Sequence, residues 1–140
     1  MAYDQDNIFA KILRGEMPCH KIYEDTNTFA FLDIMPRADG HTLIIPKSPS
    51  RNLLDASDGD LATTIAVVKT IGRAAMTAFD APGLLVQQFN EAEAGQIVFH
   101  LHFHILPRHD GVPLRPPGQM GDNDVLVIHA EKIRAALAMS

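Results

Sequence analysis

The chain has 140 residues, of which 46% are hydrophobic and 21% charged, and its formal net charge at pH 7 is −5. This length fits one domain, residues 1–140, with a core that needs no disulfide, and the single cysteine excludes an internal one. The negative charge argues against a nucleic-acid partner, because a phosphate backbone is held by clustered Lys and Arg. The N-terminus lacks a secretory pattern and no apolar run approaches the roughly 18 residues of a membrane span. We therefore expect a cytoplasmic location and no membrane partner.

The first third of the chain predicts a short helix followed by three strands. Asp6 or Asn7 can cap the helix, and Gly15 ends it. The apolar residues of this helix recur on one face, namely Ile8, Phe9, Ile12 and Leu13. Residues 20–34 predict two strands about a turn at residues 25–27, and residues 40–47 predict a third strand that ends at Pro46.

A long helix, two strands and a last helix complete the predicted elements. Ser57 and Asp60 have the spacing of a helix cap. The apolar residues that follow recur at helical spacing: Leu61, Ile65, Val68, Ala75, Met76 and Phe79. Residues 83–89 predict a strand, residues 90–95 a loop, and residues 108–122, which are rich in Pro and Gly, a loop or arm.

The last helix is expected to begin at residues 122–124. We expect it to turn five apolar residues inward: Val127, Ile128, Ile133, Ala136 and Leu137. Closely coupled strands, with one long helix inserted among them, favour an antiparallel α+β domain. No internal repeat or linker divides the chain.

The segment FHLHFHILPRH, residues 99–109, alternates histidines with apolar residues. Alternation is typical of a strand, whose successive side chains point to opposite faces of a sheet. Leu101, Phe103 and Ile105 would face the core, and Pro107 would end the strand. The imidazoles of His100, His102 and His104 would then line the other face, about 6.5–7 Å apart.

Three interpretations of this pattern are open. The histidines can be solvated side chains on an open sheet face. They can also bind zinc, with His41 or His104 as a further ligand, although three imidazoles in line span more than a tetrahedral site needs. In the third interpretation, one neutral imidazole attacks a phosphorus atom while its neighbours donate hydrogen bonds to the phosphate oxygens. Gly95 just upstream would let backbone N–H groups approach the same phosphate. The third interpretation uses every histidine of the segment.

The stretch NEAEAGQIVFHLHFHILPR, residues 90–108, resembles the signature of the histidine triad (HIT) proteins. Residues 6–18 and 30–47 also resemble blocks of that family, and they occur in the same order. The resemblance implies an α+β, HIT-like fold with an antiparallel sheet of about five strands, a long helix, and N- and C-terminal helices. It also implies a homodimer and the hydrolysis or transfer of a nucleoside monophosphate group.

The resemblance assigns a role to each candidate site residue. His102 matches the nucleophile that takes the nucleotidyl group, while His104 and His41 match histidines around the phosphate. His100 matches the residue that supports the central ring, and we expect a backbone carbonyl near His100 to fix the tautomer of His102. The expected phosphate-binding residues are Asn90, Gly95, Gln96 and Ile97. Asp33 matches the carboxylate that accepts the ribose hydroxyls, and the apolar walls around the base match Ile8, Phe9, Ile12, Phe31, Ile34 and Leu43.

Two departures from the family pattern bear on these expectations. Ile97 stands where many members carry a small hydroxyl residue that assists the leaving group, so only its backbone N–H remains as a donor. Asn7 and Ala10 stand where some bacterial relatives carry a Cys-x-x-Cys zinc pair, so we expect no metal and no cofactor.

The predicted substrate is a purine nucleoside 5′-monophosphate derivative of adenosine or guanosine. The predicted reaction is cleavage of a phosphoramidate through a nucleotidyl-histidine intermediate, which Asn90 favours. A dinucleoside polyphosphate is the alternative substrate. A non-catalytic nucleotide-binding or interaction protein is the alternative from another class.

Overall fold

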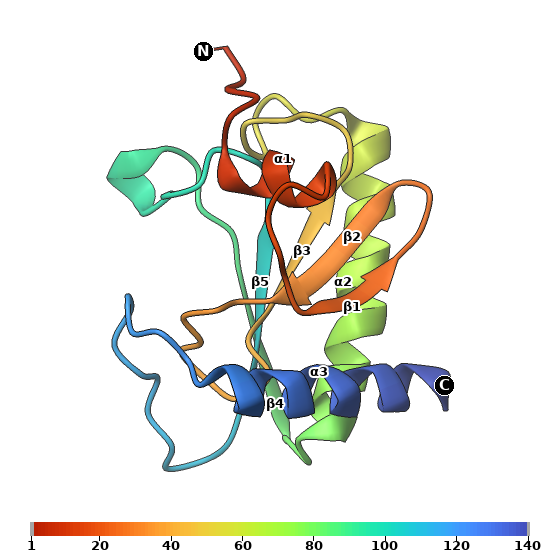
Figure 1. Cartoon of the computed structure of the whole chain (residues 1–140), viewed down its shortest axis with the longest axis vertical. Helices are drawn as coiled ribbons and strands as arrows, with labels where there is room; N and C mark the ends of the chain where they lie inside the picture. Colours follow the sequence, from red (N-terminus) through yellow and green to blue (C-terminus); the bar gives the residue numbers. More distant parts are fainter. Residues whose placement is uncertain (1, 140) are drawn as a thin grey trace.

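The computed structural model describes residues 2–139, and its elements form an α+β domain around one five-stranded antiparallel sheet (Figure 1). The strands lie in the order β1-β2-β3-β5-β4. Their bounds are Lys21–Glu24 for β1, Thr28–Leu32 for β2, Thr42–Pro46 for β3, Gly83–Gln87 for β4 and Phe103–Arg108 for β5. The helices are α1 (Ile8–Leu13), α2 (Asp58–Ala78), the short 3₁₀-helix η1 (Ala92–Ala94) and α3 (Asn123–Ala138). The predicted fold class and element order are confirmed.

Both faces of the sheet are covered. The long helix α2 packs on β3 and β5, and α3 crosses β1 and α2, as Figure 1 shows. Residues of these helices and strands share the larger core, which contains Ala30, Leu32, Ile44, Ile71, Ile105 and Ile133. On the opposite face, α1 places Phe9 against Phe31 and Leu43 in a smaller cluster. Every residue of β2 and β3 is therefore buried, as expected for strands enclosed on both faces.

The helices begin where the sequence predicts. Asn7 Oδ1 accepts a hydrogen bond from the Ala10 amide, and Ser57 Oγ accepts one from the Asp60 amide. Asp122 caps α3 in the same way. Such caps satisfy amides that have no partner inside the helix. Among the helices of residues 2–139, none is both long and apolar enough to cross a membrane.

The expected strand across residues 99–107 is wrong at both ends. The strand β5 begins only at Phe103, because the preceding backbone bonds elsewhere: the Leu101 amide donates to the Ser50 carbonyl, and the His100 carbonyl accepts from the His102 ring. The strand also continues through Pro107. It pairs with β3 only up to Ile105, so Pro107 needs no donor toward that neighbour. Leu101, Phe103 and Ile105 nevertheless join the core as predicted.

The inward face of α3 also differs from the prediction. Ile133 is fully buried, and Ala136 and Leu137 pack partly against the core, but Val127 is 40% and Ile128 54% exposed. The buried face is formed by Leu126, Ala130 and Ile133, whose spacing of four and three residues follows one stripe of a helix. In α2, the predicted Ile65 is likewise exposed, whereas Ile71 is buried.

This face of α3 can be tested with a matched pair of variants. Ile133→Ala should lower the free energy of unfolding by about 2–4 kcal/mol, because it leaves a cavity in the core. Ile128→Ala makes the same chemical change on the exposed side of the helix and should stay within about 0.5 kcal/mol of the unaltered protein. Urea denaturation of both variants measures the difference, and equal losses would contradict this assignment of the helix faces.

Candidate active site

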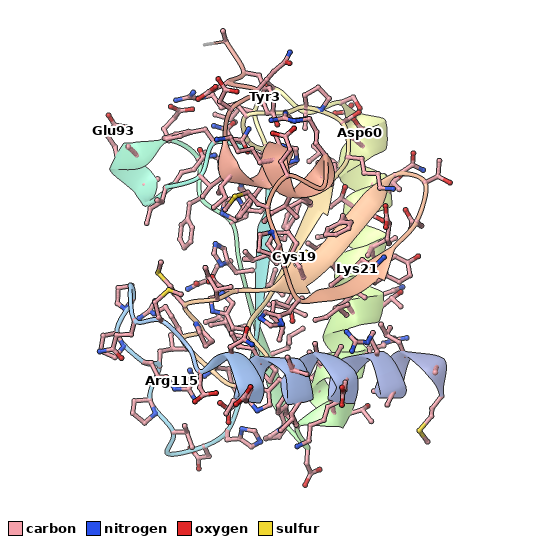
Figure 2. All side chains as sticks on the ribbon, viewed as in Figure 1. Tyr3, Cys19, Lys21, Asp60, Glu93 and Arg115 are labelled. Atoms are coloured by element: carbon pink, nitrogen blue, oxygen red, sulfur yellow. The ribbon has the colours of Figure 1, made fainter. Side chains whose placement is uncertain are left out.

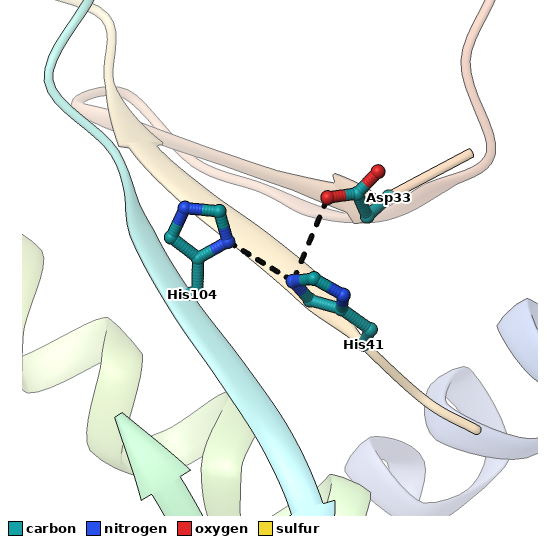
Figure 3. Close-up of side chains that lie close together, drawn as sticks. All are labelled: Asp33, His41 and His104. Atoms are coloured by element: carbon teal, nitrogen blue, oxygen red, sulfur yellow. Dashed lines mark hydrogen bonds and ion pairs between the residues drawn. The ribbon is translucent and has the colours of Figure 1, made fainter. Parts of the chain in front are cut away.

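Asp33, His41 and His104 meet at one end of the central strands (Figure 3). Asp33 directly follows β2, and His41 directly precedes β3, so the antiparallel pairing of these strands places them side by side. The Asp33 amide donates to the His41 carbonyl at 3.0 Å. His104 lies in β5 opposite Leu43, one strand further along the sheet. Residues from two distant parts of the sequence thus share one corner of the fold.

A directed chain of hydrogen bonds links these side chains. The Arg37 backbone amide, which can only donate, donates to His41 Nδ1 at 3.1 Å. His41 must therefore carry its proton on Nε2, which lies 3.0 Å from His104 Nδ1 (Figure 3). His104 accepts there and keeps its own proton on Nε2. Within residues 2–139, that buried Nε2–H has no acceptor. This series of hydrogen bonds ends at His104 Nε2–H, a donor that is available to an anionic ligand.

His102 is fixed in the opposite tautomer. Its Nδ1 lies 2.6 Å from the His100 carbonyl oxygen, which can only accept, so the proton is on Nδ1. This is the expected contact between His102 and a backbone carbonyl at His100. The free lone pair is then on Nε2. The His102 and His104 ring centroids are 4.9 Å apart, so the ring with the free lone pair packs against the ring with the available donor.

Burial keeps the histidines of this region neutral. It lowers the pKa of His41 to about 4 and that of His104 to about 3, and the nearby Arg37 charge contributes to both shifts. Burial also lowers the pKa of His102, although the bond to the His100 carbonyl opposes the shift. A neutral imidazole retains the lone pair that nucleophilic attack requires.

His100 does not share the site with its ring. The ring is fully buried, its Nε2–H donates to the Pro46 carbonyl at 2.8 Å, and its Nδ1 accepts from the Tyr3 hydroxyl. Burial lowers the pKa of His100 to about 4. Only its backbone carbonyl contacts His102. The structure thus places His100 as an anchor for the segment that carries His102.

Asn90 is held by its side-chain amide. Its Oδ1 accepts from the Leu53 amide at 3.0 Å, and its Nδ2 donates to Gln88 Oε1 at 2.9 Å. The loop is braced further by Arg51, whose Nε and Nη2 each lie 2.8 Å from an oxygen of Glu91. Glu91 has φ +74°, which an L-residue adopts only when its surroundings hold it there. No pattern in the sequence indicated this Arg51–Glu91 pair, which joins two loops 40 residues apart.

The three other expected phosphate-binding residues differ in their geometry. The Gly95 and Gln96 amides donate to carbonyls inside the loop, to Ala92 and Glu91. The Gln96 side chain is buried and donates to the Arg51 and Val98 carbonyls, so it braces the loop. Ile97 is 84% exposed, and in the described part of the chain its amide makes no hydrogen bond. Of these residues, Ile97 alone offers a free backbone donor.

The expected nucleoside-binding residues divide into two groups. Phe9, Phe31 and Leu43 are buried in the smaller cluster, with Ile12 packed against it. Ile8 and Ile34 are each 40% exposed. Asp33, next to Ile34 in the sequence, has its Oδ1 accepting from the Met35 amide and its Oδ2 3.5 Å from His41 Nε2. Burial raises the pKa of Asp33.

Asp33, His41 and His104 offer possible ligand atoms within 4.8 Å of one another, but their protonation does not fit a metal. A metal on His41 Nε2 would force the proton onto Nδ1, where it would face the Arg37 N–H. Metal-bound histidines instead direct their second nitrogen, as a donor, to an acceptor. The expected absence of a metal stays a prediction from the sequence.

The chain is similar to proteins that contain a HIT domain. The model of that domain matches residues 14–111. The crystal structure of a Hit-like protein involved in cell-cycle regulation from Bartonella henselae has a TM-score of 0.93 and 51% identity, covering 97% of this chain and 99% of that one. Protein hit of Bacillus subtilis is 42% identical over 73% of this chain and 70% of its own length. Adenosine 5′-monophosphoramidase HNT1 of Candida albicans is 36% identical over 99% and 95%, respectively.

The buried histidines predict a pH dependence of stability. In the unfolded chain their pKa returns to about 6.5, well above the folded values near 4 for His41 and His100 and near 3 for His104. Between these values the unfolded chain binds more protons, so the free energy of unfolding rises with pH. This stability is complete above about pH 6.5 and is lost as the pH falls toward the folded values.

Urea denaturation at about pH 7.5, 6 and 5 should therefore show a steady loss of stability. A His104→Asn variant, which lacks one of the titrating groups, should show a shallower loss over the same interval. If the imidazole resonances assigned to His41, His100 or His104 titrate near pH 6.5 in the folded protein, the burial argument is wrong.

Proposed function

The chain belongs to the HIT family, and on this premise we propose that it hydrolyses purine nucleoside 5′-phosphoramidates at the α-phosphorus. One observation carries the proposal: the His102 ring, whose Nε2 keeps its lone pair, packs against the His104 ring, whose Nε2–H has no acceptor among residues 2–139. A phosphate between these groups would meet a nucleophile and an oxygen-binding donor together. The printed name of the Candida albicans relative, an adenosine 5′-monophosphoramidase, supports the same reaction class.

In the proposed first step, His102 Nε2 attacks the phosphorus in line with the leaving amine. The phosphorus–Nε2 bond forms, the bond from phosphorus to the amine breaks, and the amine takes a proton from water. The His102 ring then carries positive charge, which the His100 carbonyl stabilises through the Nδ1–H bond. His104 Nε2–H donates to a non-bridging phosphate oxygen, where negative charge gathers.

In the second step, the hydroxide left by that proton transfer attacks the same phosphorus. The phosphorus–Nε2 bond breaks, the nucleoside monophosphate leaves, and His102 returns to its neutral form. The net reaction consumes one water and releases one amine. Ile97 supplies no side-chain proton to the leaving group, so its contribution is the free backbone N–H.

The nucleoside would lie between Asp33 and the apolar residues of α1 and the neighbouring strands. The two oxygens of Asp33 can accept from the two ribose hydroxyls, a pairing that suits a carboxylate. The exposed side chains of Ile8 and Ile34 offer the surface on which a purine ring can stack. Phe9 and Phe31, whose ring centroids are 5.3 Å apart, pack against each other in the smaller cluster.

His102→Asn tests the nucleophile. The variant should lose at least about 10³-fold of the rate of adenosine monophosphate release from adenosine 5′-phosphoramidate, because no other side chain can form the covalent intermediate. His109→Asn, at an exposed histidine on the other side of Pro107, is the matched control and should retain activity. A substantial rate from His102→Asn would contradict the mechanism.

A parallel assay decides between the alternatives. Monophosphate release from the phosphoramidate is compared with release from a diadenosine polyphosphate, using the same enzyme. Faster release from the polyphosphate would replace the proposed substrate class. If both compounds persist while adenosine monophosphate binds, the protein is a nucleotide-binding protein without this activity.

We further propose that the protein is a homodimer joined along β4. This strand pairs with β5 on one side, and its other edge is unpaired within residues 2–139. Val86, in the middle of the strand, is 45% exposed. Antiparallel pairing of two such edges would bury Val86 and join the two sheets into one.

Val86→Arg should weaken this dimer, because it places like charges close together across the symmetry axis. Light scattering coupled to size-exclusion chromatography should give twice the chain mass for the unaltered protein and a lower mass for the variant. Ile65→Arg, at a similarly exposed position on α2, is the control and should remain dimeric. A monomeric unaltered protein would overturn the proposal.

A further inference from the structure

The Pro-rich arm, residues 112–121, is attached to the loop that carries two site residues. This site loop, residues 33–41, begins at Asp33 and ends at His41. Arg115 and Arg37 form a reciprocal pair: the Arg115 amide donates to the Arg37 carbonyl at 2.8 Å, and Arg37 Nε–H donates to the Arg115 carbonyl at 2.8 Å. Figure 2 shows Arg115 on the arm that leads into α3.

The Arg115 guanidinium extends this attachment. Its Nη2 pairs with the Asp39 carboxylate, and its Nη1 lies 3.5 Å from the Pro36 carbonyl. At the other end of the arm, the Gly121 amide donates to the Ile34 carbonyl at 2.8 Å. The arm therefore holds the site loop at several points between its two functional residues.

The attachment of the arm to Arg37 affects the series of hydrogen bonds that runs from Arg37 through His41 to His104. The Arg37 amide begins that chain by donating to His41 Nδ1, and the remainder of Arg37 is bonded to Arg115. If Arg37 moves, no donor excludes a proton from His41 Nδ1, and the Asp33 carboxylate, 3.5 Å from His41 Nε2, is the remaining contact that favours the Nε2 proton. In molecules with the proton on Nδ1, His104 Nδ1 loses its donor, and the proton of His104 is no longer confined to Nε2.

We propose that Arg115 is a positioning residue of the active site. Together with the Arg37 side chain, it holds the Arg37 amide on His41 and so keeps His104 Nε2–H directed at the substrate phosphate. The effect on catalysis rests on the proposed function, but the effect on the histidine tautomers does not. Neither arginine side chain contacts the reacting atoms in this proposal.

A purely structural role of Arg115 would lower the stability of the whole fold when the side chain is removed. The Arg115 and Asp39 side chains are 45% and 55% exposed, and ion pairs this exposed contribute little to global stability. The bonds of the arm instead restrict a loop whose displacement by a fraction of an ångström would disturb catalysis. Loss of the Arg115 and Arg37 side-chain bonds should therefore reduce kcat much more than it reduces the melting temperature.

The test uses Arg115→Ala, Arg37→Ala and the double variant, with Gln119→Ala on the same arm as the control. Each substitution removes one side-chain contribution and leaves the backbone bond from the Arg115 amide to the Arg37 carbonyl. We expect kcat for the phosphoramidate to fall severalfold in each single variant and about tenfold or more in the double variant. Melting temperatures should change little, and Gln119→Ala should behave as the unaltered protein.

Nitrogen chemical shifts of His41 and His104 provide a readout that needs no substrate. In the unaltered protein both rings should carry the proton on Nε2, and the double variant should show a mixture at His41. Unaltered tautomers together with unaltered kcat would overturn the proposal, as would a loss of activity explained by unfolding in all three variants. If the unaltered protein hydrolyses nothing, the proposed function fails, and the tautomers alone decide the role of Arg115.

Discussion

The candidate site depends on one hydrogen bond whose direction cannot be reversed, that from the Arg37 amide to His41 Nδ1. A side chain in this place could rotate or exchange a proton, but a backbone N–H can only donate. This bond therefore decides which nitrogen of His41 is protonated and, through His41, which nitrogen of His104 is protonated. A second group with fixed polarity, the His100 carbonyl, determines the opposite tautomer for His102. The two constraints make neighbouring rings of the same residue type chemically different.

This arrangement explains why the site needs a rigid frame. The His100 carbonyl has a defined position because the His100 ring is bonded on both sides, to Tyr3 and to Pro46. Asn90 is held in a similar way by Leu53 and Gln88, on a loop that the Arg51–Glu91 pair secures. Much of the polar structure around the histidines therefore serves to orient groups. Few of these contacts would be worth much as isolated contributions to stability.

The sequence predicted the parts of this structure that depend on local chemistry. The cap at Ser57 and the core side chains of Leu101, Phe103 and Ile105 follow from spacing, while the caps at Asn7 and Asp122 were each predicted to within one or two residues. The extent of β5 could not be predicted from spacing, because the hydrogen bond from the His102 ring to the His100 carbonyl interrupts the strand pattern. The inward face of α3 was misjudged because apolar residues occur on more than one side of that helix.

The candidate site was predictable to a similar degree. The alternating histidines drew attention to His102 and His104, and the resemblance to a family added His41, Asn90 and Asp33. Arg37 and Arg115 could not be found in this way. Arg37 acts through its backbone amide, which any residue except proline would supply, and its partner on the arm lies 78 residues further along the chain. Such contributions depend on where the backbone passes, and residue type does not reveal that.

The His104 Nε2–H, which has no acceptor among residues 2–139, bears on how the site would bind an anion. A buried donor with no acceptor costs about 1–3 kcal/mol, and nearly all such groups in folded proteins are satisfied. A phosphate oxygen placed against it would remove that penalty and would form a charge-assisted bond in a largely desolvated setting. The directed chain from Arg37 prevents the ring from relieving the penalty by exchanging its tautomer. The same bonds that hold the His104 proton on Nε2 therefore prepare the site for an anion.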